Sequence, residues 1–159
     1  MPRTSRVFIR ASLLYLGVGV VLGALLLVNR WLLQSPVVAA LRTSHAEALV
    51  AGWLTQFIMG VGWWLFPPLP TGLRPNTPLP ARRGQEQRGS EALFWATFVC
   101  LNIGILLAAV FAPVYRWTSI EAFRVLAGIS GIFMLVAALA FVINAWGRIR
   151  EMGQRKSAR

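Results

Sequence analysis

Four long apolar runs constrain this chain more than any other feature of its sequence. They cover residues 7–28, 44–66, 91–112 and 121–146, and each is close to the ~20 residues that an α-helix needs to cross a bilayer core. Of the 159 residues, 57% are hydrophobic and 13% are charged, which is more apolar than a soluble domain of this size. We therefore predict one all-α membrane domain with four transmembrane helices.

Polar or small residues mark the ends of these runs. Residues 67–90 hold six prolines and four arginines, a composition that predicts an extended loop. Residues 147–159 are expected to form a basic tail, with Gly147 ending the fourth helix. Pro113 is expected near the end of the third helix.

Three serines are candidates for helix caps, and one of them, Ser90, is expected to cap the third helix. Ser44, with Glu47 three residues later, has the spacing of a capping box at the start of the second helix. Ser119 is expected to cap the N-terminus of the fourth helix. This interpretation gives Glu47 a structural role, and the alternative is a carboxylate that transfers protons.

The distribution of positive charge predicts the orientation of the chain. Its net charge is +11, and twelve of its sixteen basic residues lie in the two termini and in the loop 67–90. The other connectors hold only Arg30, Arg42, Arg116 and Arg124. Because cytoplasmic segments carry the excess of basic residues, we predict that both termini are cytoplasmic. The same pattern indicates the lipid bilayer, and not nucleic acid, as the partner of this charge.

The second apolar run begins with a potential metal ligand. His45 is the only histidine of the chain, and Glu47 is the one ionisable residue in the apolar run that follows it. Trp63 and Trp64 lie near the far end of this run, where interfacial aromatic residues gather, and prolines follow from Pro67. The pattern predicts a membrane helix with a histidine at its outer entrance.

Two segments are similar to a known family. The stretch H-A-E-A-L-V-A-G-W-L-T-Q-F-I-M-G-V-G-W-W-L-F-P, from His45 to Pro67, resembles the second helix of heme-copper oxidase subunit I and of the related nitric oxide reductases. The pattern R-G-x-E-x-L-x-W…L-N-x-G, from Arg88 to Gly104, is shared with short bacterial subunit I-like membrane proteins. The resemblance implies a multi-pass protein of the bacterial inner membrane, in a respiratory or electron-transfer context. It also implies that His45 binds the iron of a b-type heme.

The resemblance does not extend to the catalytic centre of that family. A six-coordinate heme iron needs two axial ligands, and the family's further histidines are absent from this chain. We therefore predict that the chain alone does not reduce oxygen or nitric oxide. Three sources of a second ligand remain open: a second His45 in a homodimer, a methionine such as Met59, or a histidine of another subunit. Met59 lies ~21 Å along the helix from His45, so it cannot reach the same iron within one chain.

The alternative hypothesis needs no cofactor. In it, His45 is an interfacial polar residue held by hydrogen bonds, and the chain is a non-catalytic structural or assembly subunit. Small residues on the first two helices predict close helix contacts, so we expect a homo-oligomer or a complex with another membrane subunit. These residues are Gly19, Gly23, Ala48, Gly52 and Gly60, with the polar Gln56 beside the last three. Asn102 is expected to hydrogen-bond between helices, and Cys100 to be an inert core residue.

Overall fold

The computed structural model describes residues 3–66 and 89–157, and within these ranges every element is helical. Within these described ranges, four helices are long and apolar enough to cross a membrane: Arg3–Leu33, Pro36–Leu65, Glu91–Thr118 and Glu121–Trp146. The predicted all-α class with four apolar helices is confirmed. The predicted extended loop lies almost wholly outside the described residues.

Each membrane-length helix is built from one or more elements. They are α1 (Arg3–Val28), the π-helical turn η1 (Asn29–Leu33), α2 (Pro36–Ala39), α3 (Arg42–Glu47), the π-helical stretch η2 (Ala48–Thr55), α4 (Gln56–Leu65), α5 (Glu91–Thr118) and α6 (Glu121–Ser157). Elements α3, η2 and α4 follow one another without a break and form the second long helix.

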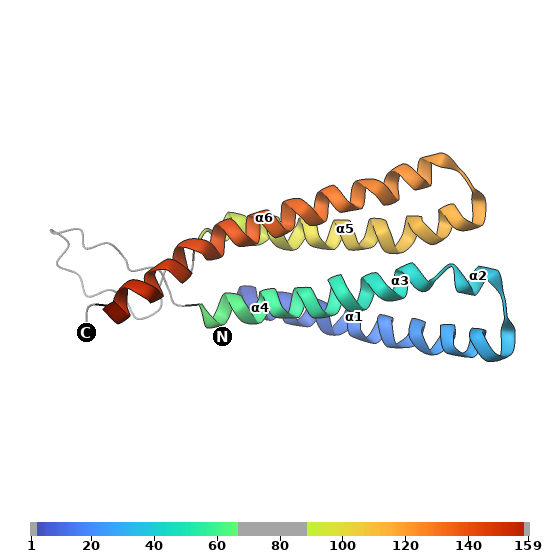
Figure 1. The fold of residues 1–159 in the computed structure, drawn as a ribbon, viewed down its shortest axis with the longest axis horizontal. Coiled ribbons are helices and arrows are strands. Elements are labelled where there is room, and N and C mark those ends of the chain that lie inside the picture. The colour runs from blue at the N-terminus through green and yellow to red at the C-terminus, as the bar shows by residue number, and fades with distance from the viewer. Residues whose placement is uncertain (1–2, 67–88, 158–159) are drawn as a thin grey trace.

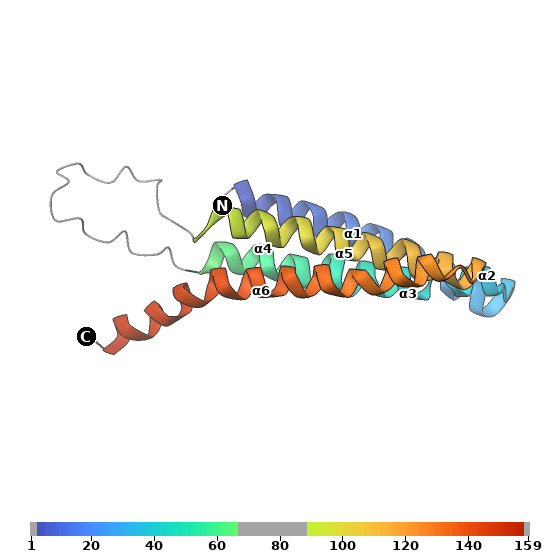
Figure 2. The ribbon, with the colours of Figure 1, turned by 90° about the horizontal axis from the view of Figure 1, so that it is seen from above.

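The helices form two antiparallel hairpins (Figure 1). The first pairs α1 with the second long helix, and the second pairs α5 with α6. The two views together place α1 beside α4 and α5, with α6 diagonally opposite α1 (Figure 2). We call the end where α4 stops and α5 begins the α4/α5 end, and the opposite end, which contains α2, the α2 end.

The core of the bundle is densest toward the α4/α5 end. The ring centroid of Phe94 in α5 lies 4.8 Å from that of Phe8 in α1 and 4.9 Å from that of Trp63 in α4. Met59, Leu101, Ile105 and Ala137 complete this buried cluster. Offset aromatic pairs of this kind stabilise a core beyond the apolar area that they bury, so the cluster holds the two hairpins together.

The small residues of the first two helices allow close packing inside the chain. A Cβ atom added to Gly52 would lie 2.5 Å from Cγ of Tyr15, and one added to Gly60 would lie 2.7 Å from Cβ of Phe8. Side chains of α1 therefore occupy the surface that the sequence suggested for a partner. These small residues therefore pack within the chain, and a homo-oligomer or a complex with another membrane subunit stays a prediction.

Pro113 does not end α5, which continues to Thr118. A proline inside a helix has no N–H to donate to the carbonyl four residues before it, here that of Ala109. The Ser44 hydroxyl of α3 donates a hydrogen bond of 2.5 Å to this Ala109 carbonyl. In a membrane, a neighbouring helix commonly satisfies a backbone group that proline has freed. Ser44 is therefore not the predicted cap, and α3 begins before it, at Arg42.

This arrangement predicts a coupled effect of two substitutions. Ser44→Ala leaves the Ala109 carbonyl without its donor, which is expected to cost ~1–3 kcal/mol of unfolding free energy. In the double variant with Pro113→Ala, the restored N–H of residue 113 satisfies the carbonyl, so the cost of Ser44→Ala is expected to fall close to zero. A double-mutant cycle of unfolding in detergent measures this coupling. Additive effects of the two substitutions would contradict it.

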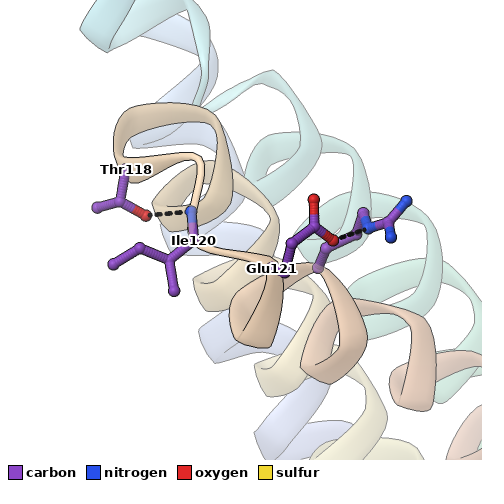
Figure 3. A network of polar contacts seen from close by, with 4 residues as sticks. Thr118, Ile120 and Glu121 are labelled. Carbon is purple, nitrogen blue, oxygen red and sulfur yellow. Dashed lines mark hydrogen bonds and ion pairs between the residues drawn. The ribbon is translucent and has the colours of Figure 1, made fainter.

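The turn between α5 and α6 differs from the prediction for Ser119. Ser119 has a left-handed backbone conformation with φ of 57°, and its N–H donates to the Tyr115 carbonyl at 2.8 Å. It therefore ends α5 and does not cap α6. The Thr118 hydroxyl accepts a hydrogen bond from the Ile120 N–H at 3.4 Å, and the Glu121 carboxylate pairs with Arg124 at 2.6 Å (Figure 3).

Two further boundaries differ from the prediction. The first helix begins at Arg3, earlier than expected, and α6 continues through Gly147 to Ser157. Glycine lowers helix propensity by ~1 kcal/mol relative to alanine but does not by itself stop a helix. The predicted basic tail therefore begins as a continuation of α6.

Candidate functional site

His45 lies on α3 close to the α2 end and is half-buried. Its Nδ1 atom is 2.9 Å from the Gly19 carbonyl oxygen of α1. Because a carbonyl oxygen only accepts hydrogen bonds, Nδ1 carries the hydrogen. In the neutral imidazole, Nε2 is then the nitrogen with a free lone pair, which is the atom that could bind a metal.

The imidazole ring packs directly on α1. A Cβ atom added to Gly23 would lie 2.8 Å from Cε1 of His45. Gly19 thus supplies an acceptor and Gly23 supplies space for the ring. The Gly19–Gly23 pair does mediate a close helix contact, as its spacing predicted, but the contact is with the second long helix of the same chain.

A cleft of about 310 Å³ lies beside His45, between the end of α1 and the start of α3. One part of its lining is polar and the other is apolar. The polar residues are Asn29, Arg30, Arg42 and His45, and the others are Gly23, Leu26, Leu27 and Ala39. The sequence suggested His45 as a site residue, but not the two arginines that the fold places around the same cleft.

The site meets some requirements of a b-type heme. A histidine that binds a metal usually donates its second ring N–H to a carbonyl or carboxylate, as His45 does to Gly19. The volume of the cleft, however, is at the lower end of the ~300–1,000 Å³ typical of small-molecule sites, and heme is a large ligand. His45 is the only histidine, and Met59 belongs to the core cluster toward the other end of the bundle. One chain therefore does not fit a heme that is ligated from both faces.

No richer metal site is formed elsewhere in the described chain. Residues 3–66 and 89–157 contain no group of three or more histidine, cysteine, aspartate or glutamate side chains that could hold a metal ion. Cys100 is partly buried and packs against the core cluster. Glu47 is half-buried at the end of α3, and Ser44 turns toward α5, so these two residues do not form the predicted capping box.

Asn102 and Gln56, two polar residues predicted at membrane depth, differ in their hydrogen bonding. The Asn102 side chain accepts a hydrogen bond from the Tyr15 hydroxyl at 3.0 Å and donates one to the Phe98 carbonyl at 2.8 Å. It therefore links α5 to α1, as expected for a polar residue between membrane helices. Gln56 is fully buried, and its amide atoms have no hydrogen-bond partner within the part of the chain that the structure describes.

Arg148 joins the hairpins at the α4/α5 end, a role that was not predicted from the sequence. Its side chain is only 1% exposed, and its Nη2 atom donates hydrogen bonds to the Trp63 carbonyl at 3.1 Å and to the Phe66 carbonyl. Its guanidinium carbon lies 5.0 Å from the centre of the Trp63 ring. A cation here satisfies carbonyls at the C-terminus of α4, where the helix dipole is negative.

The second segment of the family resemblance also has internal roles. Gly89, with φ of 90°, lies against the Asn144 side chain, where a Cβ atom would collide with Oδ1. Asn144 makes two 2.9 Å hydrogen bonds with the backbone N–H and carbonyl of Ser90. Ser90 caps α5 by accepting the Leu93 N–H at 3.4 Å. These residues therefore fix the start of α5 against α6.

Comparisons with known proteins identify no relative. No family model matches the chain, and neither does any curated protein or solved structure. The similarity of two segments to subunit I is thus an expectation from the sequence alone.

Proposed function

We propose that the chain is a multi-pass inner-membrane protein that acts as a non-catalytic structural or assembly subunit. The contact of His45 with Gly19 and Gly23 carries this proposal, because it gives the only histidine a packing role within the chain. In the proposed orientation, both termini are cytoplasmic and the α2 end faces outward, consistent with the distribution of basic residues.

The exposed faces of the helices support membrane insertion. Large apolar side chains remain uncovered along the bundle, including Leu14 of α1, which is 73% exposed, and Ile143 of α6, which is 65% exposed. In water, contiguous apolar faces of this kind lead to association. In a bilayer they match the hydrocarbon of the lipid, and the helical backbone satisfies its own polar groups.

Exposed tryptophans lie at both ends of the bundle. Trp31 and Trp117 lie at the α2 end, and Trp64, Trp95 and Trp146 lie toward the α4/α5 end. Tryptophan is enriched at both membrane–water interfaces, because its ring is apolar and its N–H is polar. This arrangement supports a bundle that spans the bilayer with its two ends in the headgroup regions.

Heme binding together with a second polypeptide is the other candidate function. The observation that favours it is the tautomer of His45, which directs its Nδ1 hydrogen to Gly19 and leaves Nε2 as a potential ligand. A second chain would have to supply the other axial ligand and much of the enclosure. Such a complex would belong to an electron-transfer system.

Two variants of His45 separate these functions. Asparagine places an N–H donor close to the position of Nδ1 but has no equivalent of Nε2, whereas alanine removes both nitrogens. For a packing role, we expect His45→Asn to stay close to the wild-type stability. His45→Ala is expected to lose ~1–2 kcal/mol of unfolding free energy.

The absorption spectrum completes this test. We expect the protein purified from heme-replete cells to show no Soret band. A Soret band in the wild type that disappears in both His45→Asn and His45→Ala would reject the packing role as the function of His45 and establish heme ligation. Unfolding measured in detergent and spectra recorded on the same samples provide both results.

A further inference from the structure

The cleft beside His45 concentrates positive charge at one end of the bundle. Arg30 and Arg42 are exposed and line it, and none of its eight lining residues is acidic. Two guanidinium groups around one cleft attract an anion, and their planar N–H donors match the oxygens of a phosphate group.

Hydrogen bonds fix the backbone around this cleft. The buried Asn29 side chain donates to the Ser35 carbonyl at 3.1 Å and accepts the Ser35 N–H at 2.8 Å. The Trp117 indole of α5 donates to the Val37 carbonyl at 3.0 Å, which joins α5 to the segment between α1 and α3. The backbone that carries Arg30 is therefore held in place before any ligand binds, which lowers the entropic cost of binding.

The cleft also has an apolar part to its lining. Leu26, Leu27 and Ala39 lie beside the two arginines, and Leu27 is 60% exposed. The guanidinium carbon of Arg30 lies 5.5 Å from the centre of the ring of Trp31, which is 70% exposed. Exposed tryptophan marks the headgroup level of a bilayer. A small soluble anion would neutralise the arginines but leave the apolar part uncovered.

We propose that this cleft binds one anionic phospholipid of the outer leaflet. Its phosphate lies between Arg30 and Arg42, and an acyl chain follows Leu26 and Leu27 along α1. The inference goes beyond the subunit role and rests only on the proposed membrane placement. It does not require that His45 bind a cofactor.

Native mass spectrometry of the detergent-purified protein tests this site. The protein is delipidated and titrated with phosphatidylglycerol or with zwitterionic phosphatidylcholine, and one molecule of phosphatidylglycerol is expected to bind preferentially. Arg30→Gln and Arg42→Gln are each expected to weaken this binding about fivefold, the factor that corresponds to ~1 kcal/mol for one cation near an anionic lipid. The double variant is expected to lose the preference over phosphatidylcholine.

Arg116→Gln is the matched control. Arg116 is an exposed arginine in the last turn of α5, at the same end of the bundle, but it does not line the cleft. Circular dichroism verifies that all variants keep the helical content of the wild type. An equal loss of affinity in Arg116→Gln would show that the effect is diffuse surface charge and would overturn the site.

Two other results would also reject the lipid site. Equal binding of both lipids would indicate an apolar contact alone, and displacement of phosphatidylglycerol by an equal concentration of inorganic phosphate would indicate a site for a soluble anion. The membrane placement is checked separately, by alkaline extraction and by reporter fusions near Gln34 and after Arg159. Failure there rejects the proposed function, whereas failure of the lipid titration alone rejects only the site.

Discussion

Replacing Arg148 with methionine is expected to lower the free energy of unfolding by about 3 kcal/mol or more, because α4 loses a charged donor to two backbone carbonyls. Each hydrogen bond to a charged group contributes ~1.5–3 kcal/mol, and the carbonyls of Trp63 and Phe66 both accept from this guanidinium. The ring contact with Trp63 is lost as well. Methionine retains an unbranched apolar side chain, so the substitution removes mainly the polar interactions.

Arg116→Met provides the control for this substitution. Arg116 is exposed at the other end of the bundle, so its replacement is expected to change stability by less than ~0.5 kcal/mol. Arg148→Lys is expected to be intermediate, because lysine keeps the charge but lacks the planar set of donors. Thermal unfolding in detergent, followed by circular dichroism, measures all three variants. If Arg148→Met were as stable as Arg116→Met, Arg148 would not hold the end of α4.

Gly52→Leu is expected to destabilise the first hairpin by about 3 kcal/mol, at the upper end of the usual cost of overpacking a tight contact. The new side chain would collide with the Tyr15 ring, whose Cγ lies 2.5 Å from the position of a Cβ atom on residue 52. Because this contact lies within one chain, the loss of stability is expected at every protein concentration, without a change of oligomeric state.

Gly17→Leu is the matched control in α1. No atom lies within 4 Å of a Cβ atom added to Gly17, which faces outward. Leucine is also a better helix former than glycine by ~1 kcal/mol, so this variant is expected to be neutral or slightly more stable. Unfolding in detergent, together with light scattering, separates the two effects. A Gly52→Leu protein of wild-type stability that dissociates from an oligomer would instead support a partner surface at this position.

The sequence was sufficient to predict the fold class and the number of long helices. Both follow from the number and length of the apolar runs, which can be read directly along the sequence. The helix ends were predicted less well, because contacts between helices decide them. Pro113 remains inside α5, with Ser44 of another helix bonded to the Ala109 carbonyl, and Gly147 remains inside α6.

In the candidate site, too, the sequence predicted a single residue but not the contacts between helices around it. His45 was found from the sequence because a single histidine at the start of an apolar run is conspicuous. The acceptor of its Nδ1 hydrogen on Gly19 and the placement of Arg30 and Arg42 around one cleft depend on how two helices pair, which local sequence does not encode. Arg148 was assigned to the basic tail for the same reason, since only the folded bundle brings it to the end of α4.

The hydrogen bond between Ser44 and Ala109 has a consequence for biogenesis. Ribosomal synthesis completes the first hairpin before α5 exists, so the hydroxyl donor is made ahead of the carbonyl that needs it. Within α5, no N–H is available for the Ala109 carbonyl, because residue 113 is proline. The Ser44 hydroxyl of α3, which is synthesised earlier, supplies the missing donor. We therefore expect α5 to reach its final packing only after the first hairpin is present to supply this donor.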